Sequence, residues 1–161
     1  MKLVKKELVL LKQKHPQMET YGEHQVSAFG LELLRTVLIP ELLGDETPSI
    51  LYWSGRKLAR HYPLNDLSEL PLFFERAGWG NLEIQDEQKE KCGIWLSSEL
   101  IEARLKLDET PVFSLEAGFL AEQFEQIKGF TTEAYTEPKP NRHKKIEFQI
   151  KWDLKDPVLK D

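Results

Sequence analysis

Residues 51–62, LYWSGRKLARHY, decide how this chain is interpreted, because a glycine stands here beside a serine and ahead of several basic residues. A phosphate-binding loop needs more glycines, a position between a strand and a helix, and a lysine followed by Ser or Thr. Here leucine follows the lysine, and the apolar residues Tyr52 and Trp53 before the serine belong to the same predicted helix as the residues after it. The stretch therefore predicts a helix in which Gly55 permits close packing of another helix. If an acidic ligand binds, we expect Arg56 to contact it.

Helical spacing continues on both sides of this stretch. Over residues 27–43 the apolar residues form a broad stripe, which Pro40 is expected to kink or end. A shorter helix follows and closes at Gly78, since glycine is common directly after a helix. The longest predicted helix begins at Ser114 and ends before Gly129.

After residue 80 the period changes from helical to alternating. Leu82 and Ile84 flank a polar residue, and Cys92, Ile94 and Leu96 again stand at every second position. Apolar and polar residues alternate strictly over 146–153. Such alternation is typical of strands with one buried face, and the short polar segments between them predict two hairpins. The order along the chain is therefore helices, two strands, helices and two strands.

Length and composition fit a single globular domain. The 161 residues are 40% apolar and 30% charged, which is ordinary for a chain that buries one core. The net charge of −5 argues against nucleic-acid binding, because phosphate neutralisation needs a dominant basic face. We divide the chain into a lysine-rich and helical extension over 1–20, one domain over 21–155 and a tail over 156–161.

The one cysteine, Cys92, falls in the apolar register of a strand, so we expect a small buried hydrophobe there. A single cysteine forms no intramolecular disulfide, and this fits a reducing compartment. The apolar run 8–11 is too short for a signal-peptide core or a membrane span. We therefore expect a soluble cytoplasmic protein whose basic N-terminal helix is not a membrane anchor.

A series of motifs resembles a known family. The motifs are ELLRTVLIPELLG, YWSGRKLARHYPL, LPLFFERAGWGNLEI, FSLEAGFLAEQFEQ and IKWDLKDPV. Together they resemble the YslB-like family of uncharacterised bacterial proteins over residues 21–158. That family is similar in turn to the superfamily of TRAPP vesicle-transport subunits, vinyl-reductase-like small-molecule-binding domains and, more remotely, haem nitric-oxide sensors.

This resemblance implies an α/β (α+β) fold, in which two hairpins form a four-stranded antiparallel sheet packed against a helical layer. It also implies homodimers formed through helical faces and, in some members, an apolar ligand cavity. Two features of the superfamily are missing here. The loop 63–66 has no cysteine to be acylated, and the last hairpin has no cysteines that could bind a metal.

A ligand cavity among the predicted helices would be lined by apolar side chains and by two glycines. These residues are Leu51, Gly55, Leu58, Phe73, Phe74, Leu115, Gly118, Phe119 and Phe124. Without a ligand the same residues form the core, because apolar residues at helical spacing usually pack together. The four histidines lack the spacing of a zinc site, so we predict neither a metal nor a cofactor.

We predict a non-enzymatic cytoplasmic binding or adaptor module, a homodimer that binds an apolar or acyl-type molecule or a protein partner. Acid–base catalysis is not indicated, because Glu116 lies in a first helical turn, where carboxylates are favoured, and Glu122 is expected on a solvated face. The alternative is an enzyme of unknown reaction, or a sensor that uses Cys92 as a reactive thiol or His61 as a haem ligand.

Overall fold

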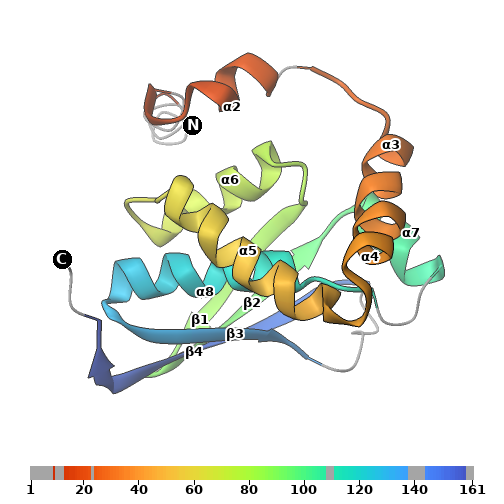
Figure 1. The fold of residues 1–161 in the computed structure, drawn as a ribbon. Coiled ribbons are helices and arrows are strands. Elements are labelled where there is room, and N and C mark those ends of the chain that lie inside the picture. The colour runs from red at the N-terminus through yellow and green to blue at the C-terminus, as the bar shows by residue number, and fades with distance from the viewer. Residues whose placement is uncertain (1–8, 10–12, 23, 108–110, 138–143, 159–161) are drawn as a thin grey trace.

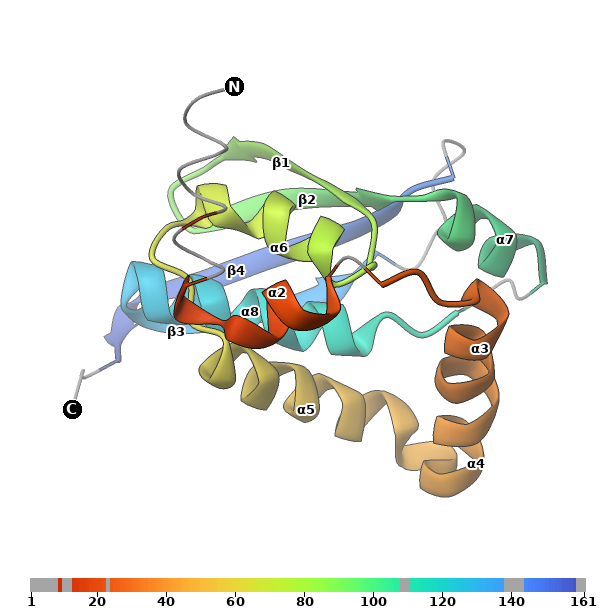
Figure 2. The same ribbon diagram turned by 90° about the horizontal axis from the view of Figure 1, so that it is seen from above.

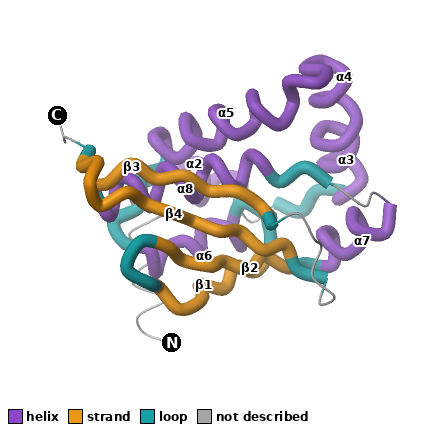
Figure 3. Tube along the Cα trace, turned by 90° about the horizontal axis from the view of Figure 1, so that it is seen from below, coloured by secondary structure: helices purple, strands orange, loops and turns teal. Residues whose placement is uncertain are grey.

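The computed structural model describes residues 9, 13–22, 24–107, 111–137 and 144–158. Two hairpins form one antiparallel sheet with the order β1-β2-β4-β3, and helices pack on one of its faces (Figure 1). In the view from below, the sheet lies in front of part of the helical layer (Figure 3). The predicted fold class is confirmed. The strands are β1 Asn81–Glu87, β2 Lys91–Ser97, β3 Phe130–Thr136 and β4 Ile146–Pro157.

The helical layer is made of several helices, some of them a single turn. Among the helices that the structure describes, none is both long and apolar enough to cross a membrane. In chain order they are α2 Pro16–Tyr21, α3 Ala28–Glu32, η1 Leu33–Leu38, α4 Ile39–Leu43, η2 Gly44–Glu46, α5 Thr47–His61, η3 Leu67–Glu69, α6 Leu70–Arg76, α7 Glu99–Leu107 and α8 Ser114–Lys128.

Alternation along the strands places one apolar row under the helices. In the register of β2 and β4, Ile94 pairs with Phe148 and Cys92 pairs with Ile150. All four side chains are buried. The outward positions between them are polar or partly exposed, which is the pattern of a sheet with one covered face.

The long helix α8 lies on this apolar row. Its residues Phe119, Leu120 and Phe124 are fully buried between the sheet and the other helices. Gly129 ends the helix with a φ of 78°, a left-handed conformation that glycine adopts without strain. The chain then turns directly into β3, as the sequence predicts.

Helix α5 crosses α8 at a point where both helices carry a glycine. A Cβ atom added at Gly55 would overlap the carbonyl oxygen of Leu115, and one added at Gly118 would overlap that of Tyr52. The backbones therefore touch, which only residues without a side chain allow. The close packing predicted at Gly55 is confirmed.

The segments α3, η1 and α4 form one continuous helix at one end of the molecule (Figure 2). The helix does not end at Pro40 but continues to Leu43, and η1 before it has the wider turns of a π-helix. Proline lacks an N–H group, and its ring crowds the carbonyl four residues earlier, here that of Thr36. The wider turn makes room for the ring.

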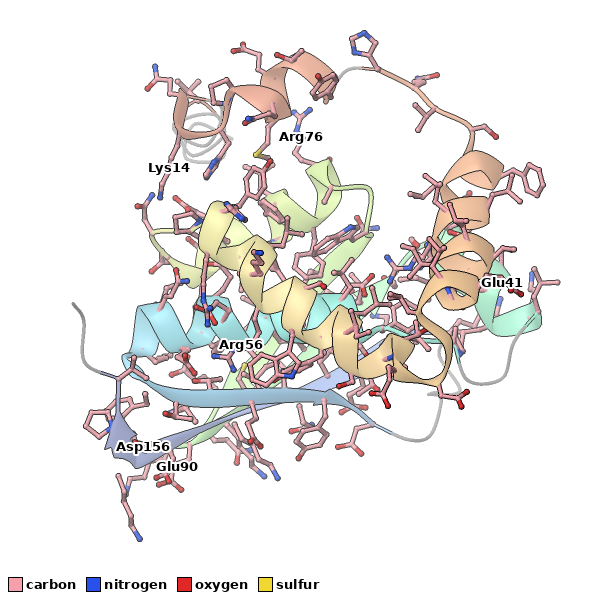
Figure 4. All side chains as sticks on the ribbon, in the orientation of Figure 1. Lys14, Glu41, Arg56, Arg76, Glu90 and Asp156 are labelled. Carbon is pink, nitrogen blue, oxygen red and sulfur yellow. The ribbon has the colours of Figure 1, made fainter. Side chains whose placement is uncertain are left out.

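The short helix α2 packs on the side of the helical layer away from the sheet (Figure 1). The ring of His15 lies 4.9 Å from that of Tyr62, and Nζ of Lys14 donates to the carbonyl of Pro63 at 2.6 Å. Figure 4 shows Lys14 and Arg76 beneath α2. Part of the predicted extension thus contacts the domain, whereas its lysine-rich beginning lies mostly outside the described residues.

Candidate functional site

A pocket opens between the α3–α4 helix and α7, at the end of the molecule where these elements stand side by side (Figure 2). Its volume is about 450 Å³, within the usual range of small-molecule sites. Most of the lining is apolar. The lining residues are Phe29, Glu32, Leu33, Arg35, Thr36, Val37, Pro40, Thr47, Leu51, Leu100, Ala103, Arg104, Leu107, Pro111 and Val112.

Two ion pairs supply the charged part of the lining. Arg104 of α7 donates from two nitrogens to the two carboxylate oxygens of Glu32, at 2.8 and 2.6 Å. Arg35 donates to both oxygens of Glu116, the nearer at 2.5 Å and the other at 2.7 Å. These pairs join the α3–α4 helix to α7 and α8. Each charged side chain of the lining therefore has a partner of opposite charge.

The aromatic ring of Phe113 lies against both guanidinium groups. Its centroid is 5.8 Å from the guanidinium carbon of Arg35 and 5.8 Å from that of Arg104. The ring is buried, and a cation over a buried aromatic face is attracted to it. The two arginines are thus oriented by a ring of the core as well as by their carboxylates.

The residues predicted to line a cavity are distributed differently. Leu51 lines the pocket, whereas Gly55 and Gly118 form the contact between α5 and α8. The aromatic residues form the core, with the rings of Phe73 and Phe119 stacked at 4.6 Å. Phe74 and Phe124 are fully buried, and Leu58 packs against this core. Leu115 is half-buried and gives its carbonyl to the glycine contact.

The side chain of Arg56 points from α5 toward α8 and β3 (Figure 4). Nε lies 2.9 Å from a carboxylate oxygen of Glu122, and a terminal nitrogen lies 2.7 Å from Glu125. The other terminal nitrogen donates to the carbonyl of Thr132 at 3.1 Å. An external anion at Arg56 would therefore have to displace a carboxylate of the same chain.

The expectation that Glu122 faces solvent is wrong. Only 4% of this residue is exposed, and its carboxylate also accepts from Arg60 Nε at 2.7 Å. Burial alone would raise the pKa of Glu122, but hydrogen bonds from Arg60, Gln126 and Arg56 outweigh it and lower the pKa. The pKa of Arg56 is raised, because its carboxylate partners outweigh the effect of burial. The cluster therefore stays charged and ties α5, α8 and β3 together.

The two residues of the alternative hypothesis lie in different settings. Cys92 is buried in the sheet, and burial raises the pKa of its thiol to about 11, with a contribution from the carboxylate of Glu87. His61 is exposed at the end of α5. Within the described ranges, no three His, Cys, Asp or Glu side chains gather in a way that could hold a metal ion.

Residues 28–151 match the model of a protein family described as "Protein of unknown function (DUF2507)". The chain belongs to this family. In agreement with that membership, the chain is 40% identical over 141 residues to the "Uncharacterized protein YslB" of Bacillus subtilis (strain 168), covering 88% of this chain and 95% of the relative. The matched DUF2507 region contains α3 to α8, and so it includes every element that lines the pocket.

Solved structures share the fold of this DUF2507 protein at low sequence identity. A vinyl-4-reductase family protein from Methanocaldococcus jannaschii matches with a TM-score of 0.65 at 18% identity, covering 93% of this chain and 95% of that one. The phenol-responsive sensory domain of the transcription activator PoxR, solved with phenol, matches with a TM-score of 0.56 at 12% identity, covering 79% and 75%. The resemblance stated from the sequence motifs is confirmed.

The pocket and its two ion pairs were not predicted from the sequence of this DUF2507 protein. One signal was available, because Glu32 and Arg35 are charged residues among the apolar residues of the first half of this helix. Charges in an apolar stretch are expected to have partners nearby. Their partners Arg104 and Glu116, however, lie 72 and 81 residues further along the chain.

Proposed function

We propose that this protein is a non-enzymatic binding module of the cytoplasm, and that it binds an apolar small molecule in the pocket between the α3–α4 helix and α7. The observation that carries the proposal is the pocket of about 450 Å³ with apolar walls from separate elements. Removing apolar ligand surface from water is the main source of affinity in such a site.

The fold of the solved relatives supports the choice of a binding function. The PoxR domain was solved with phenol, and at 12% identity the likeness concerns the fold alone. We infer that the present chain uses the same architecture to hold a small apolar molecule. A cytoplasmic location rests on the single reduced cysteine rather than on the pocket.

Binding without chemistry is supported by the state of the reactive groups. The buried carboxylate of Glu116 is paired with Arg35, and the pKa of Glu122 is lowered because hydrogen bonds from Arg60, Gln126 and Arg56 outweigh its burial. The thiol of Cys92 is buried with a raised pKa, and such thiols are poor nucleophiles. A general acid or a nucleophile would need a different environment.

We further propose that a second copy of the chain covers the outer side of the α3–α4 helix. The pocket uses one side of this helix, whereas four leucines on other positions remain 38 to 73% exposed. An apolar stripe of this kind marks an interaction site. An uncharged stripe also suits self-association, because two copies that each carry −5 would repel through charged faces. The leucines are Leu31, Leu34, Leu38 and Leu42.

The binding proposal is tested by filling the pocket. Ala103→Trp places an indole at the pocket wall, and Ala77→Trp places the same group at an exposed alanine after α6, outside the pocket lining. We expect the apolar dye Nile red to bind the wild type and the Ala77→Trp control equally, and Ala103→Trp about tenfold more weakly, a loss of about 1.4 kcal/mol. The measurement is the rise of dye fluorescence with protein concentration.

Native mass spectrometry of the purified protein adds a second readout, because it reports a retained ligand directly. Equal dye binding by all three proteins would place the dye elsewhere and overturn the pocket as the binding site. Absence of dye binding together with an empty wild-type protein would overturn the binding function itself.

A further inference from the structure

We propose that Arg104 binds the head group of the ligand, and that the ligand is an amphiphile with a carboxylate. This inference rests on the proposed binding function and adds the chemical class of the ligand. In the structure the guanidinium of Arg104 is held by both oxygens of Glu32, at 2.8 and 2.6 Å. A ligand carboxylate can make the same fork, so Glu32 occupies the position that the ligand head group would take.

Exchange of one carboxylate for another keeps the charge balance of the pocket. Removing Glu32 from Arg104 without a replacement would leave a cation in an environment where only 9% of its side chain is exposed. A neutral ligand offers no such replacement. A carboxylate ligand restores the pair, and Glu32 gains hydration when it leaves. The exchange therefore discriminates in favour of an anionic head group.

The second ion pair of the pocket is not suited to this exchange. Glu116 belongs to the central helix α8 and its side chain is 1% exposed, so it cannot reach water when it leaves Arg35. The side chain of Glu32 is 18% exposed and belongs to the helix at the end of the molecule. Glu32 can therefore turn outward, whereas Glu116 stays in place.

Arg104 is also held in position when Glu32 leaves. The ring of Phe113 lies 5.8 Å from its guanidinium carbon and does not depend on the α3–α4 helix. Apolar residues that line the same pocket, Leu100 and Leu107 on the same helix and Val112 beyond it, offer contacts for an alkyl or aryl tail. The site thus combines one fixed cation with an apolar wall.

Decanoate and decanol share a chain and differ in the head group, so their displacement of Nile red from the wild-type protein tests the inference. We expect decanoate to be the stronger competitor. Glu32→Gln removes the charge of the carboxylate that competes with the ligand for Arg104. We expect this variant to bind decanoate about tenfold more tightly and to bind decanol with unchanged affinity. Glu41→Gln is the matched control, because Glu41 is exposed on the same continuous helix and does not line the pocket (Figure 4).

Arg104→Lys gives the complementary result, because lysine keeps the charge but cannot form the fork. We expect Arg104→Lys to bind decanoate more weakly and to bind decanol with unchanged affinity. If decanol competes as well as decanoate and Glu32→Gln changes neither, the head-group inference is overturned while the apolar pocket stands. If neither compound displaces the dye and Ala103→Trp leaves dye binding unchanged, the inference and the proposed pocket fail together.

Discussion

Cys92 shows how a strand position fixes the chemistry of a side chain. Cys92, Ile94 and Leu96 occupy alternate positions of β2 on its buried face, so the thiol faces the helices, and the residue is 1% exposed. Burial disfavours the thiolate and, with the carboxylate of Glu87, raises the thiol pKa to about 11. The same position in an accessible, basic setting would give a reactive thiol, which is what the alternative sensor hypothesis requires.

This pKa shift predicts a loss of stability at alkaline pH. In the unfolded chain the thiol ionises near pH 9, so the stabilisation from the buried neutral thiol is complete below that value and is lost as the pH rises toward 11. By about pH 10 the wild type should lose roughly 1 kcal/mol of unfolding free energy relative to Cys92→Ala. The measurement is urea unfolding of both proteins from neutral pH to about pH 10. If the unfolding free energies of the two proteins change with pH in the same way, the raised pKa of Cys92 is contradicted.

Arg56 shows what the sequence does and does not reveal about a single side chain. Its place beside Gly55 on a helix could be predicted, and so could the carboxylates of the later helix. Its partners Glu122 and Glu125 could not, because they are set by where two helices cross. Glu122 lies one turn after Gly118, so the glycine contact brings it next to Arg56. The side of α5 that carries Arg56 is thus part of a buried, charged cluster in the structure.

At the level of elements, the crossing of α5 and α8 depends on two glycines. A methyl group at Gly118 would overlap the carbonyl of Tyr52, which is backbone and cannot rotate away. We therefore expect Gly118→Ala to lower the unfolding free energy by about 1–3 kcal/mol or more. Gly30→Ala is the opposite control, because nothing lies near its added methyl group, and it should gain about 0.5–1 kcal/mol. Chemical denaturation of both variants measures these unfolding free energies. If Gly118→Ala is as stable as the wild type, the close contact between the two backbones is contradicted.

The α3–α4 helix was predicted as a helix, but its environment was not. Its apolar residues occur on more than one side, a pattern that indicates burial or an interface without saying which. The structure separates the sides, since Phe29, Leu33 and Val37 line the pocket and the stripe beginning at Leu31 does not. The distance between this helix and α7 depends on the loops that join them to the domain. Hydrophobic spacing within one element carries no information on that distance.

For the whole molecule, local patterns were sufficient to predict the order of elements and the two hairpins. The pairing of β2 with β4, which makes one sheet from two hairpins, joins residues fifty to sixty positions apart. No local pattern contains it, and it was expected only from the resemblance to a family. The position of the pocket could not be predicted from local patterns either, because it depends on how the α3–α4 helix packs against α7.

The outer leucine stripe gives a prediction for the whole assembly. Leu34 is 54% exposed and belongs to this stripe, so Leu34→Glu places a charge where the proposed second copy binds. We expect native mass spectrometry to report a dimer for the wild type and a monomer for Leu34→Glu, because an interface that buries an unpaired charge loses several kcal/mol. Tyr135→Glu is the control, since Tyr135 is 40% exposed but belongs to β3 and not to this helix, and it should leave the dimer intact. A monomeric wild type, or a dimer that survives Leu34→Glu, would mean that the stripe is not the contact between copies.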